Sequence, residues 1–332
     1  MPNNIAQFDV SQSWGTVASP QLSILIPTYD HDVMDLCHEL LADMATLHMG
    51  AVELLVLIDG NPALEGQHAL ITSGDIAGLP VALAMATVNL GRSMARNTLA
   101  RLARGRFLMF LDADSLPDAP CFVGRALAAL GSPDVVLCGG RTGLRHTAPP
   151  LDARLFHLHS KKREWIAASE RNQDPAGCFL SANFIVARDL FLASPFDENF
   201  KAWGWEDTEW AIRVSRGSRI HHFDNSVSHM EHHKDNIWLG RLERAAPNYA
   251  RLYELYPKVV GRHRIFLLIY MLRTFSGCIP LAWLLRHCIF TTFIPAGLRL
   301  SFLKFLQALH YTRVIHNQPI KQRQNEIGES KN

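Results

Sequence analysis

Short apolar runs alternate with longer amphipathic segments through the first 140 residues. Five apolar runs have the length of buried strands: 22–28, 52–58, 81–88, 105–111 and 135–138. The segments between them predict three helices: 32–47, 92–104 and 119–130. Strands that alternate with helices of this length are typical of βαβ units, so we expect an α/β fold with a mostly parallel, Rossmann-like sheet flanked by helices.

The pattern becomes less regular after residue 150. Residues 160–174 are polar and charged, which predicts a mobile loop. Apolar and polar residues alternate over 178–190, a helix is predicted over 207–216, and a last strand over 219–227. From residue 237 onward the spacing is helical, so we expect the chain to end in a helical region.

The predicted strands of the first half end at polar residues: Thr28, Asp59, Asn89 and Asp112. In open α/β sheets the ligand site lies outside the carboxyl ends of the strands, so these side chains should share one crevice. Asp112 and Asp114 lie one residue apart, and both can offer oxygen to Mg²⁺ or Mn²⁺, which usually also holds substrate phosphates. The alternative is that both aspartates only cap the turn before Pro117.

A second pair of carboxylates, Glu206 and Asp207, opens the helix predicted over 207–216. Residues three and four apart share a helix face, so Asp207 aligns with apolar residues and should face inward. Glu206 aligns with Glu209 and Arg213 and should face outward or lie at the edge. A helix N-terminus favours an ionised carboxylate, which suits a general base. An acidic residue that only complements the helix dipole would give the same pattern.

Aromatic and imidazole side chains flank this helix. Trp203-Gly204-Trp205 precedes it, and indole faces suit sugar rings or a nucleobase, although simple core packing is the alternative. Five histidines follow the helix: His221, His222, His229, His232 and His233. Imidazole is the commonest metal ligand. His229, placed after the last predicted strand, is the one we expect to complete the coordination of a cation at Asp114; the others are expected at the surface or in the core.

The net charge of +2 conceals an uneven distribution. Residues 255–325 contain no Asp or Glu but ten Lys or Arg, so the rest of the chain carries 23 basic and 31 acidic residues, a net charge of −8. A basic tail of this kind suits a polyanionic surface. The six cysteines form no CxxC pair, which favours reduced thiols, and residues 1–21 have no apolar core of a secretory signal.

Three apolar runs in this tail are separated by arginines. The runs cover 265–272, 274–285 and 288–298, and Arg273, Arg286 and Arg299 interrupt them. A membrane-spanning helix needs about 20 mostly apolar residues. We interpret the runs as amphipathic helices that lie in a membrane interface, with the arginines reaching anionic lipid. A single span or hairpin, and ordinary helices packed on the rest of the chain or at an oligomer interface, are the alternatives.

Several separated motifs together resemble the family-2 glycosyltransferases with the GT-A fold. The matching stretches are residues 24–29, 57–60, 89–97, 110–117, 196–200 and 203–209, which read ILIPTY, LIDG, NLGRSMARN, FLDADSLP, FDENF and WGWEDTE. The resemblance spans about residues 21–235. Each motif is weak alone, but their order and spacing make the set specific. WGWED and Val227-Ser228-His229 are closest to the chondroitin-polymerase-like branch.

The resemblance implies an inverting, metal-dependent glycosyltransferase with Mn²⁺ or Mg²⁺ as cofactor. Its donor would be a nucleotide-diphosphate sugar, with a UDP-sugar as the first expectation. Its acceptor would be a hydroxyl of a glycan or of a lipid-linked molecule. Surface polysaccharide synthesis at the cytoplasmic face of the inner membrane is the expected setting, with a soluble cytoplasmic enzyme as the alternative. No nucleic acid partner is expected.

The resemblance also implies the site residues. The donor site would contain Pro27, Thr28, Tyr29, Asp59, Asn89, Arg92, Arg96, Asp112, Ala113, Asp114, Ser181, Asn183, Trp203, Gly204 and Trp205. Asp114, Asp112 and His229 would hold the metal. Asp207, beside Glu206, would be the catalytic base. Where the family commonly has serine after Asp59-Gly60, this chain has Asn61, which can form the same local turn bonds.

The expected organisation is a leader segment (1–20), a GT-A domain (21–235) and a helical region (236–332), in which residues 261–313 would meet an anionic membrane. Two other functions stay open. A nucleotidyltransferase also uses such a sheet, but no glycine-rich phosphate loop follows the first strand here. A non-catalytic sugar-nucleotide or glycan-binding module would not need a base at Asp207.

Overall fold

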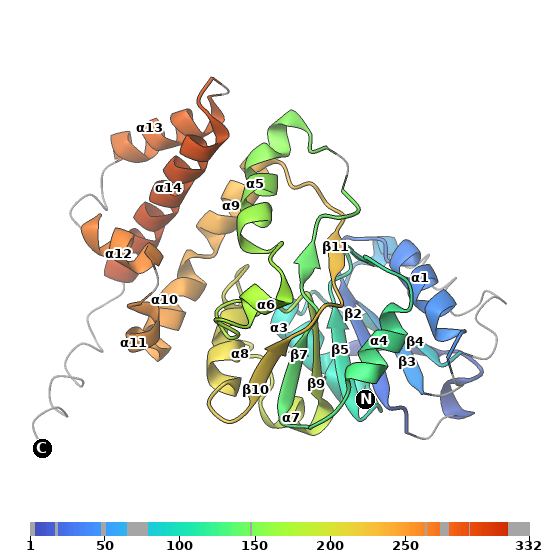
Figure 1. Cartoon of the computed structure of the whole chain (residues 1–332). Helices are drawn as coiled ribbons and strands as arrows, with labels where there is room; N and C mark the ends of the chain where they lie inside the picture. Colours follow the sequence, from blue (N-terminus) through green and yellow to red (C-terminus); the bar gives the residue numbers. More distant parts are fainter. Residues whose placement is uncertain are drawn as a thin grey trace, which may run out of the picture. The chain divides into compact units, whose positions relative to one another are not determined.

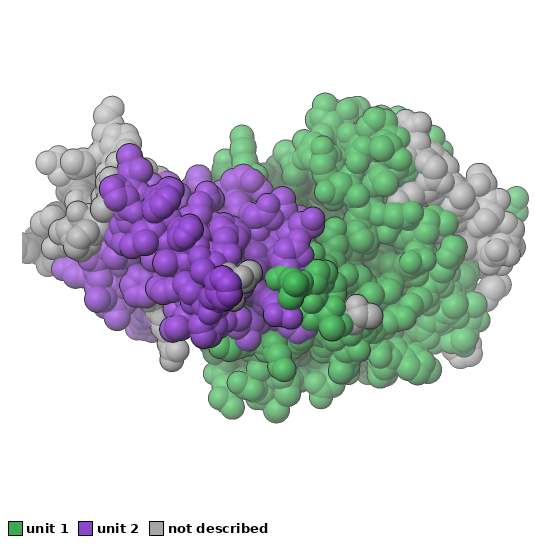
Figure 2. Space-filling view, turned by 90° about the horizontal axis from the view of Figure 1, so that it is seen from above, with its two compact units in different colours: residues 1–151, 159–201, 206–232 green, residues 152–158, 202–205, 233–332 purple. Residues whose placement is uncertain are grey.

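A computed structural model describes residues 4–16, 19–47, 51–64, 79–146, 148–262, 264–272, 279–291 and 293–317. The chain divides into two compact units, which Figure 2 colours separately. Unit 1 comprises residues 1–151, 159–201 and 206–232, and unit 2 comprises residues 152–158, 202–205 and 233–332.

A sheet of eight strands, counted over the described residues, forms the centre of unit 1. In sheet order the strands are β1 (Ile5–Val10), β4 (Val81–Ala86), β3 (Val52–Ile58), β2 (Leu22–Thr28), β5 (Phe107–Leu111), β9 (Asn183–Ala187), β7 (Val135–Cys138) and β10 (Arg219–His222). Strands β4, β3, β2 and β5 run parallel, as do β7 and β10, whereas β1 and β9 run antiparallel to their neighbours. The predicted bounds of β2, β3 and β7 are confirmed.

Helices cover both faces of this sheet, because its central strands are apolar on both sides. Side chains alternate along β2: Ile24 and Ile26 pack into one apolar cluster, and Leu25 packs into the other. Helices α1 (Met34–Met44) and α4 (Phe122–Ala129) cover the first face (Figure 1). The second face is covered by α3 (Arg92–Leu102), α7 (Arg188–Ala193) and α8 (Glu206–Val214). The expected α/β class is thus confirmed.

A small sheet connects the aspartate turn with the histidine segment. Among the described residues its strands are β6 (Ser115–Pro117), β11 (Val227–His229) and β8 (Arg141–Thr142). Strand β6 begins directly after Asp114, and its Ser115 pairs with His229. The Met230 N–H donates to the Asp114 carbonyl at 2.7 Å. This pairing places the side chain of His229 beside the turn that ends β5.

Three predictions of local structure differ from the observed elements. The mobile loop predicted over 160–174 is wrong, because α5 (Arg154–Arg163) and α6 (Ala168–Arg171) occupy most of it. The strand predicted over 219–227 is two strands, β10 and β11, in different sheets. The buried Asn225 fixes the bend between them by donating to the Phe122 carbonyl at 3.0 Å. Strand β1, inside the segment that we expected to be a leader, was not predicted.

Unit 2 is helical in its described part, as expected from residue 237 onward. Its helices are α9 (Asp235–Arg244), α10 (Ala246–Leu255), α11 (Pro257–Val260), α12 (Arg264–Met271), α13 (Ile279–Phe290) and α14 (Ala296–Asn317). Short 3₁₀ turns lie at Trp14–Thr16, at 62–64 and at Leu151–Ala153. Trp238 and Leu239 of α9 pack against Leu300 and Leu303 of α14 in one apolar core.

The arginines of the tail differ in their surroundings. Arg299 is 6% exposed; its Nε donates to the Ile289 carbonyl at 2.5 Å, and its Nη2 lies 3.5 Å from Asp235. The expectation that Arg299 reaches lipid is therefore wrong, because the buried Asp235 carboxylate holds this cation inside unit 2. Arg286 is exposed and pairs with Glu243 at 2.9 Å. Arg273 lies outside the described residues.

Neither α12, α13 nor α14, nor any other helix in the described ranges, is both long and apolar enough to cross a bilayer. Residues 273–278, which would join two of the apolar runs into a spanning segment, lie outside the described residues.

Candidate active site

The turn that ends β5 presents Asp114 to a group of charged side chains. Its Oδ2 lies 2.8 Å from His229 Nε2, and its Oδ1 lies 3.6 Å from Arg141 Nη2. Oδ1 is buried and accepts no hydrogen bond from the described residues. Burial by itself would raise the pKa of Asp114, but His229, Arg141 and Arg92 together lower that pKa far below its usual range. Asp114 is therefore an anion with one oxygen available to a ligand.

The residues around Asp114 fit a hard divalent cation. Ligand atoms of Asp114, His229 and Glu231 all lie within 4.8 Å of one another. Carboxylate oxygens suit Mg²⁺ and Mn²⁺, and an imidazole nitrogen beside them favours a transition metal such as Mn²⁺. Glu231 was not among the metal ligands expected from the sequence.

Asp112 binds a different partner from Asp114, the guanidinium of Arg96. Its Oδ1 accepts a hydrogen bond from Arg96 Nη2 at 2.6 Å, and Arg96 is 2% exposed. Burial would raise the pKa of Asp112, yet Arg96 and Arg92 lower it below its usual value. Within the described residues, Nε and Nη1 of Arg96 are buried without a hydrogen-bond acceptor. Asp112 thus orients a guanidinium that can still donate to an oxygen of a bound molecule.

Arg92, at the start of α3, links the two pairs of carboxylates in unit 1. Its Nη1 lies 3.5 Å from Glu206 Oε1. Loss of solvation would lower the pKa of Arg92, but Glu206, Asp112, Asp114 and Asp207 together raise it. Both pairs of carboxylates therefore act on one guanidinium, which is 45% exposed and open to a ligand.

The start of α8 differs from its prediction. Glu206 is 3% exposed and Glu209 is 2% exposed, so the expectation that Glu206 faces outward is wrong. Helical spacing could not reveal the cations that make this burial tolerable. Glu206 lies beside Arg92, and Glu209 accepts two hydrogen bonds from Arg213 at 2.9 and 3.0 Å.

Asp207 is partly buried and has a pKa raised to about 7. Burial is the largest cause, and the negative charge of Glu206 adds to it. The Thr208 N–H, which donates to Asp207 Oδ1 at 2.7 Å, and the charges of Arg92 and Arg96 oppose the shift. Asp114 and Asp207 are thus two carboxylates whose surroundings move their pKa values in opposite directions, a pattern typical of catalytic sites.

Two of the expected donor-site residues, Thr28 and Asp59, lie at the ends of β2 and β3. Thr28 is buried, and its Oγ1 donates to the His31 carbonyl at 2.6 Å. Asp59 is 5% exposed and accepts hydrogen bonds from the N–H groups of Leu90 (2.6 Å) and Gly91 (3.0 Å). Burial raises the pKa of Asp59, although these two hydrogen bonds oppose the shift. Asp59 therefore holds the loop that leads into α3.

The turn after Asp59 has the local bonds expected for Asn61. Its Nδ2 donates to the Tyr29 carbonyl at 2.5 Å, and its Oδ1 accepts from the Ala63 N–H at 3.1 Å. Gly60 has φ 72°, and a Cβ there would lie 2.3 Å from the carbonyl carbon of Val88. A glycine is therefore required at this turn.

The remaining predicted donor residues differ in exposure. Pro27 and Ala113 are partly exposed, and Tyr29 and Asn89 are exposed. Ser181 and Asn183 are buried. Asn183 Nδ2 donates to the carbonyls of Gly140 (3.1 Å) and Asn225 (2.8 Å), so its amide group supports the backbone.

Trp203, Gly204 and Trp205 belong to unit 2. The Trp205 indole N–H donates to Tyr311 Oη at 3.0 Å, and its ring centroid lies 4.7 Å from that of Tyr249. Trp205 thus packs in the core of unit 2, which was the alternative to a ligand-facing role. Trp203 is partly buried against the same unit's apolar cluster.

Two arginines of the site region were missed. Arg141 follows β7 and lies between Asp114, at 3.6 Å, and Glu164, at 3.5 Å. Arg171 is 4% exposed and donates to His222 Nδ1 at 3.1 Å and to the Gly139 carbonyl at 3.2 Å, which holds the turn before Arg141. A signal for Arg141 was present, because it directly follows a predicted strand and two glycines.

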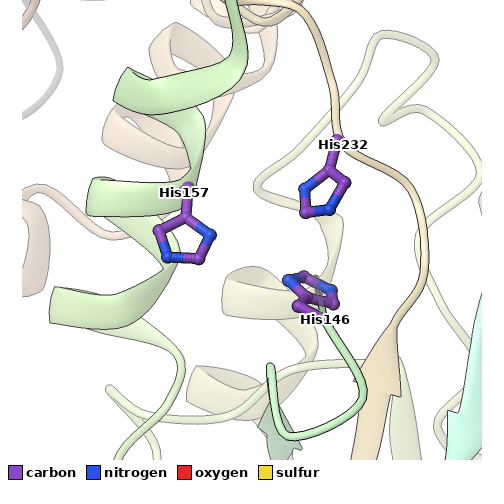
Figure 3. A group of neighbouring side chains, drawn as sticks. All are labelled: His146, His157 and His232. Carbon is purple, nitrogen blue, oxygen red and sulfur yellow. The ribbon is translucent and has the colours of Figure 1, made fainter. Parts of the chain in front are cut away.

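The other histidines have separate roles. His222 is buried between Arg171 and the Pro175 carbonyl, and His221 is exposed. His146 and His232 face each other with ring centroids 4.7 Å apart (Figure 3), and burial together with His146 lowers the pKa of His232. His146 Nε2 also contacts the His229 carbonyl. His157, drawn in the same figure, lies on α5 in unit 2.

Comparison with known proteins gives the family. The model of glycosyl transferase family 2 matches residues 23–188, half of the chain. No curated protein sequence matches. The structure is similar to the mannosyltransferase PcManGT from Pyrobaculum calidifontis, solved with GDP-Man and Mn²⁺, at 16% identity and a TM-score of 0.55, over 90% of this chain and 88% of that chain.

A second similar structure is S. aureus TarS, at 16% identity and a TM-score of 0.48, over 89% of this chain and 55% of that chain. The family match carries the assignment, and the fold of the mannosyltransferase agrees with it. The chain has the α/β GT-A fold and belongs to glycosyl transferase family 2.

Proposed function

We propose that the protein is an inverting, metal-dependent glycosyltransferase that moves a sugar from a nucleotide-diphosphate sugar to a hydroxyl of a glycan or lipid-linked acceptor. The observation that carries this proposal is the pair Asp114 and Asp207. The surroundings lower the pKa of Asp114 and raise that of Asp207, and the negative charges of both raise the pKa of Arg92. The WGWED and His229 motifs support a place near the chondroitin-polymerase-like branch, with surface polysaccharide synthesis as the role.

The donor's diphosphate would lie against Asp114, His229 and the arginines of α3. When bound, Mn²⁺ or Mg²⁺ would neutralise charge on the leaving diphosphate. Arg96 supplies two buried N–H groups without acceptors among the described residues, and Arg92 supplies an exposed guanidinium. The similar mannosyltransferase was solved with a nucleotide sugar and Mn²⁺, which supports this class of donor.

Asp207 would act as the general base. Its carboxylate accepts the proton of the acceptor hydroxyl, the hydroxyl oxygen forms a bond to the anomeric carbon, and the bond from that carbon to the diphosphate breaks. A single in-line displacement of this kind inverts the anomeric configuration. A base with a pKa of about 7 is matched to proton transfer near neutral pH. A binding module or a nucleotidyltransferase would have no need of a carboxylate with its pKa raised to about 7 at this position.

A donor screen tests this proposal. We expect the full-length protein with Mn²⁺ to release the nucleoside diphosphate from a UDP-sugar or a GDP-sugar, faster when glycan or lipid extract is present. Inversion of the anomeric centre is read by NMR of the product. Release of pyrophosphate from nucleoside triphosphates would instead indicate a nucleotidyltransferase. Donor binding without turnover under all acceptor conditions would indicate a binding module.

We also propose that α12–α14 of unit 2 lie on an anionic membrane surface. Exposed apolar side chains gather on these helices and on the turn between α13 and α14; those more than half exposed are Leu267, Tyr270, Met271, Ile279, Trp283, Leu284, Phe293 and Leu298. Residues 255–325, which include these helices, contain no acidic residue and ten basic ones, of which Arg299 is held inside unit 2. Apolar insertion together with a positive charge excess is the combination that anionic lipid favours.

Replacing Trp283 and Phe293 by serine should reduce binding to vesicles of anionic phospholipid by at least about 10-fold, because each loses about 1.5–3 kcal/mol of apolar burial. Trp283 is 68% exposed and Phe293 is 97% exposed, so folding should be preserved. Leu144→Ser, at an apolar residue of unit 1 that is 75% exposed, is the control and should bind like the parent. Co-sedimentation with the vesicles measures the binding of each variant and of the parent. Equal binding by all three proteins, or binding only to neutral vesicles, would contradict the proposal.

A further inference from the structure

The segment that follows β11 carries a carboxylate on the same side as His229. Strand β11 ends at His229, and the hydrogen bond from Met230 N–H to the Asp114 carbonyl extends the pairing by one residue. In an extended chain, residues i and i+2 project to the same side. Glu231 therefore emerges beside His229 and toward the turn that holds Asp114.

The distances agree with this placement. Ligand atoms of Asp114, His229 and Glu231 lie within 4.8 Å of one another. Ligands bound to one cation at about 2.0–2.1 Å lie about 3 Å apart in octahedral geometry. Glu231 is 42% exposed, so its side chain can rotate across the remaining gap at small cost. Its Oε1 lies 3.8 Å from His31 Nδ1, so His31 is a neighbour of this carboxylate.

We propose that Glu231 is a third protein ligand of the catalytic cation, together with Asp114 and His229. This inference rests on the metal dependence in the proposed function. Two carboxylates offset the charge of a divalent cation, and three protein ligands suffice to hold it without a nucleotide. The free enzyme would therefore hold Mn²⁺ through Asp114, His229 and Glu231 before the donor binds.

Titration of the donor-free, full-length protein with Mn²⁺ tests this assignment, with calorimetry or the electron paramagnetic resonance signal of free Mn²⁺ as readout. Glu231→Gln should weaken Mn²⁺ binding by at least about 10-fold, because loss of a direct ligand costs no less than loss of an outer-shell partner. Glu254→Gln, at an exposed glutamate of α10, should leave binding unchanged. Asp114→Ala should abolish it. Thermal melting without metal checks that each variant is folded.

A second variant separates coordination from mere contact. His31→Gln disturbs the neighbour of Glu231 but removes no ligand, so its loss of Mn²⁺ affinity should be smaller than that of Glu231→Gln. A loss as large as that of Glu231→Gln would show that Glu231 acts through this contact, and would overturn the assignment.

The remaining outcomes distinguish the inference from the proposed function. If Glu231→Gln binds Mn²⁺ like the parent while Asp114→Ala does not, Glu231 is no ligand and the proposed function stands. If the parent binds Mn²⁺ only when UDP or GDP is present, the inference is again overturned and the metal-dependent function survives. If Mn²⁺ does not bind even with a nucleoside diphosphate, the metal dependence itself is wrong.

Discussion

Asp207→Asn is expected to lower kcat by about 10³-fold while donor affinity stays within about twofold. Asparagine has the shape of aspartate but cannot accept the proton of the acceptor hydroxyl. The measurement is nucleoside diphosphate release under saturating donor and acceptor, with donor affinity from calorimetry. Full activity in this variant would remove Asp207 from the role of base.

The pH dependence gives a second view of the same residue. Because Asp207 must be ionised to accept a proton and its pKa is about 7, kcat/KM should rise with pH through about 7. Glu206→Gln removes the negative charge that raises this pKa and should move the midpoint to lower pH, since Arg92 and Arg96 then act with less opposition. Glu209→Gln, on the same helix but paired with Arg213, should leave the midpoint in place. An unchanged midpoint in Glu206→Gln would contradict the assigned cause.

The same pKa predicts an effect on stability, with a definite sign. The folded protein holds the Asp207 proton up to a higher pH than the unfolded chain, whose pKa is 3.8. The folded state therefore binds more protons between these values, and the free energy of unfolding falls as pH rises from about 4 to about 7. Asp207→Asn should remove this fall in the free energy of unfolding and should therefore be more stable than the parent at pH 8. Urea unfolding measures the difference. Activity and stability thus make opposite demands on this carboxylate.

Asp114→Ala is expected to abolish the stabilisation by Mn²⁺ and to lower turnover by about 10³-fold, because a bound cation contributes several kcal/mol to charge stabilisation. Parent protein should melt at a higher temperature with Mn²⁺ and nucleoside diphosphate than without, by mass action. The variant should show no such shift. Ser226→Ala serves as a control, since the Ser226 hydroxyl donates to Asp118, at the far end of the β6–β11 pairing, and contacts no proposed metal ligand. A full Mn²⁺ shift in Asp114→Ala would place the cation at other residues.

The sequence determined the framework of unit 1. The apolar runs of β2, β3 and β7 gave the strands to the residue, because a strand buried on both faces leaves a continuous apolar signal. The place of Asp112 and Asp114 at the end of β5 followed from the same signal. The helical nature of the described residues between 235 and 317 was also visible, because helical spacing is a local property of the chain.

Only the tertiary structure decided which charges meet. Asp114 gains His229 and Glu231 because β6 and β11 pair across a long stretch of sequence. Glu206 is buried because Arg92 of α3 reaches it, although its own helix pattern pointed outward. Whether a carboxylate is buried, ionised or protonated depends on partners and solvent exclusion from distant segments. Residue spacing along one helix or strand contains no record of those partners.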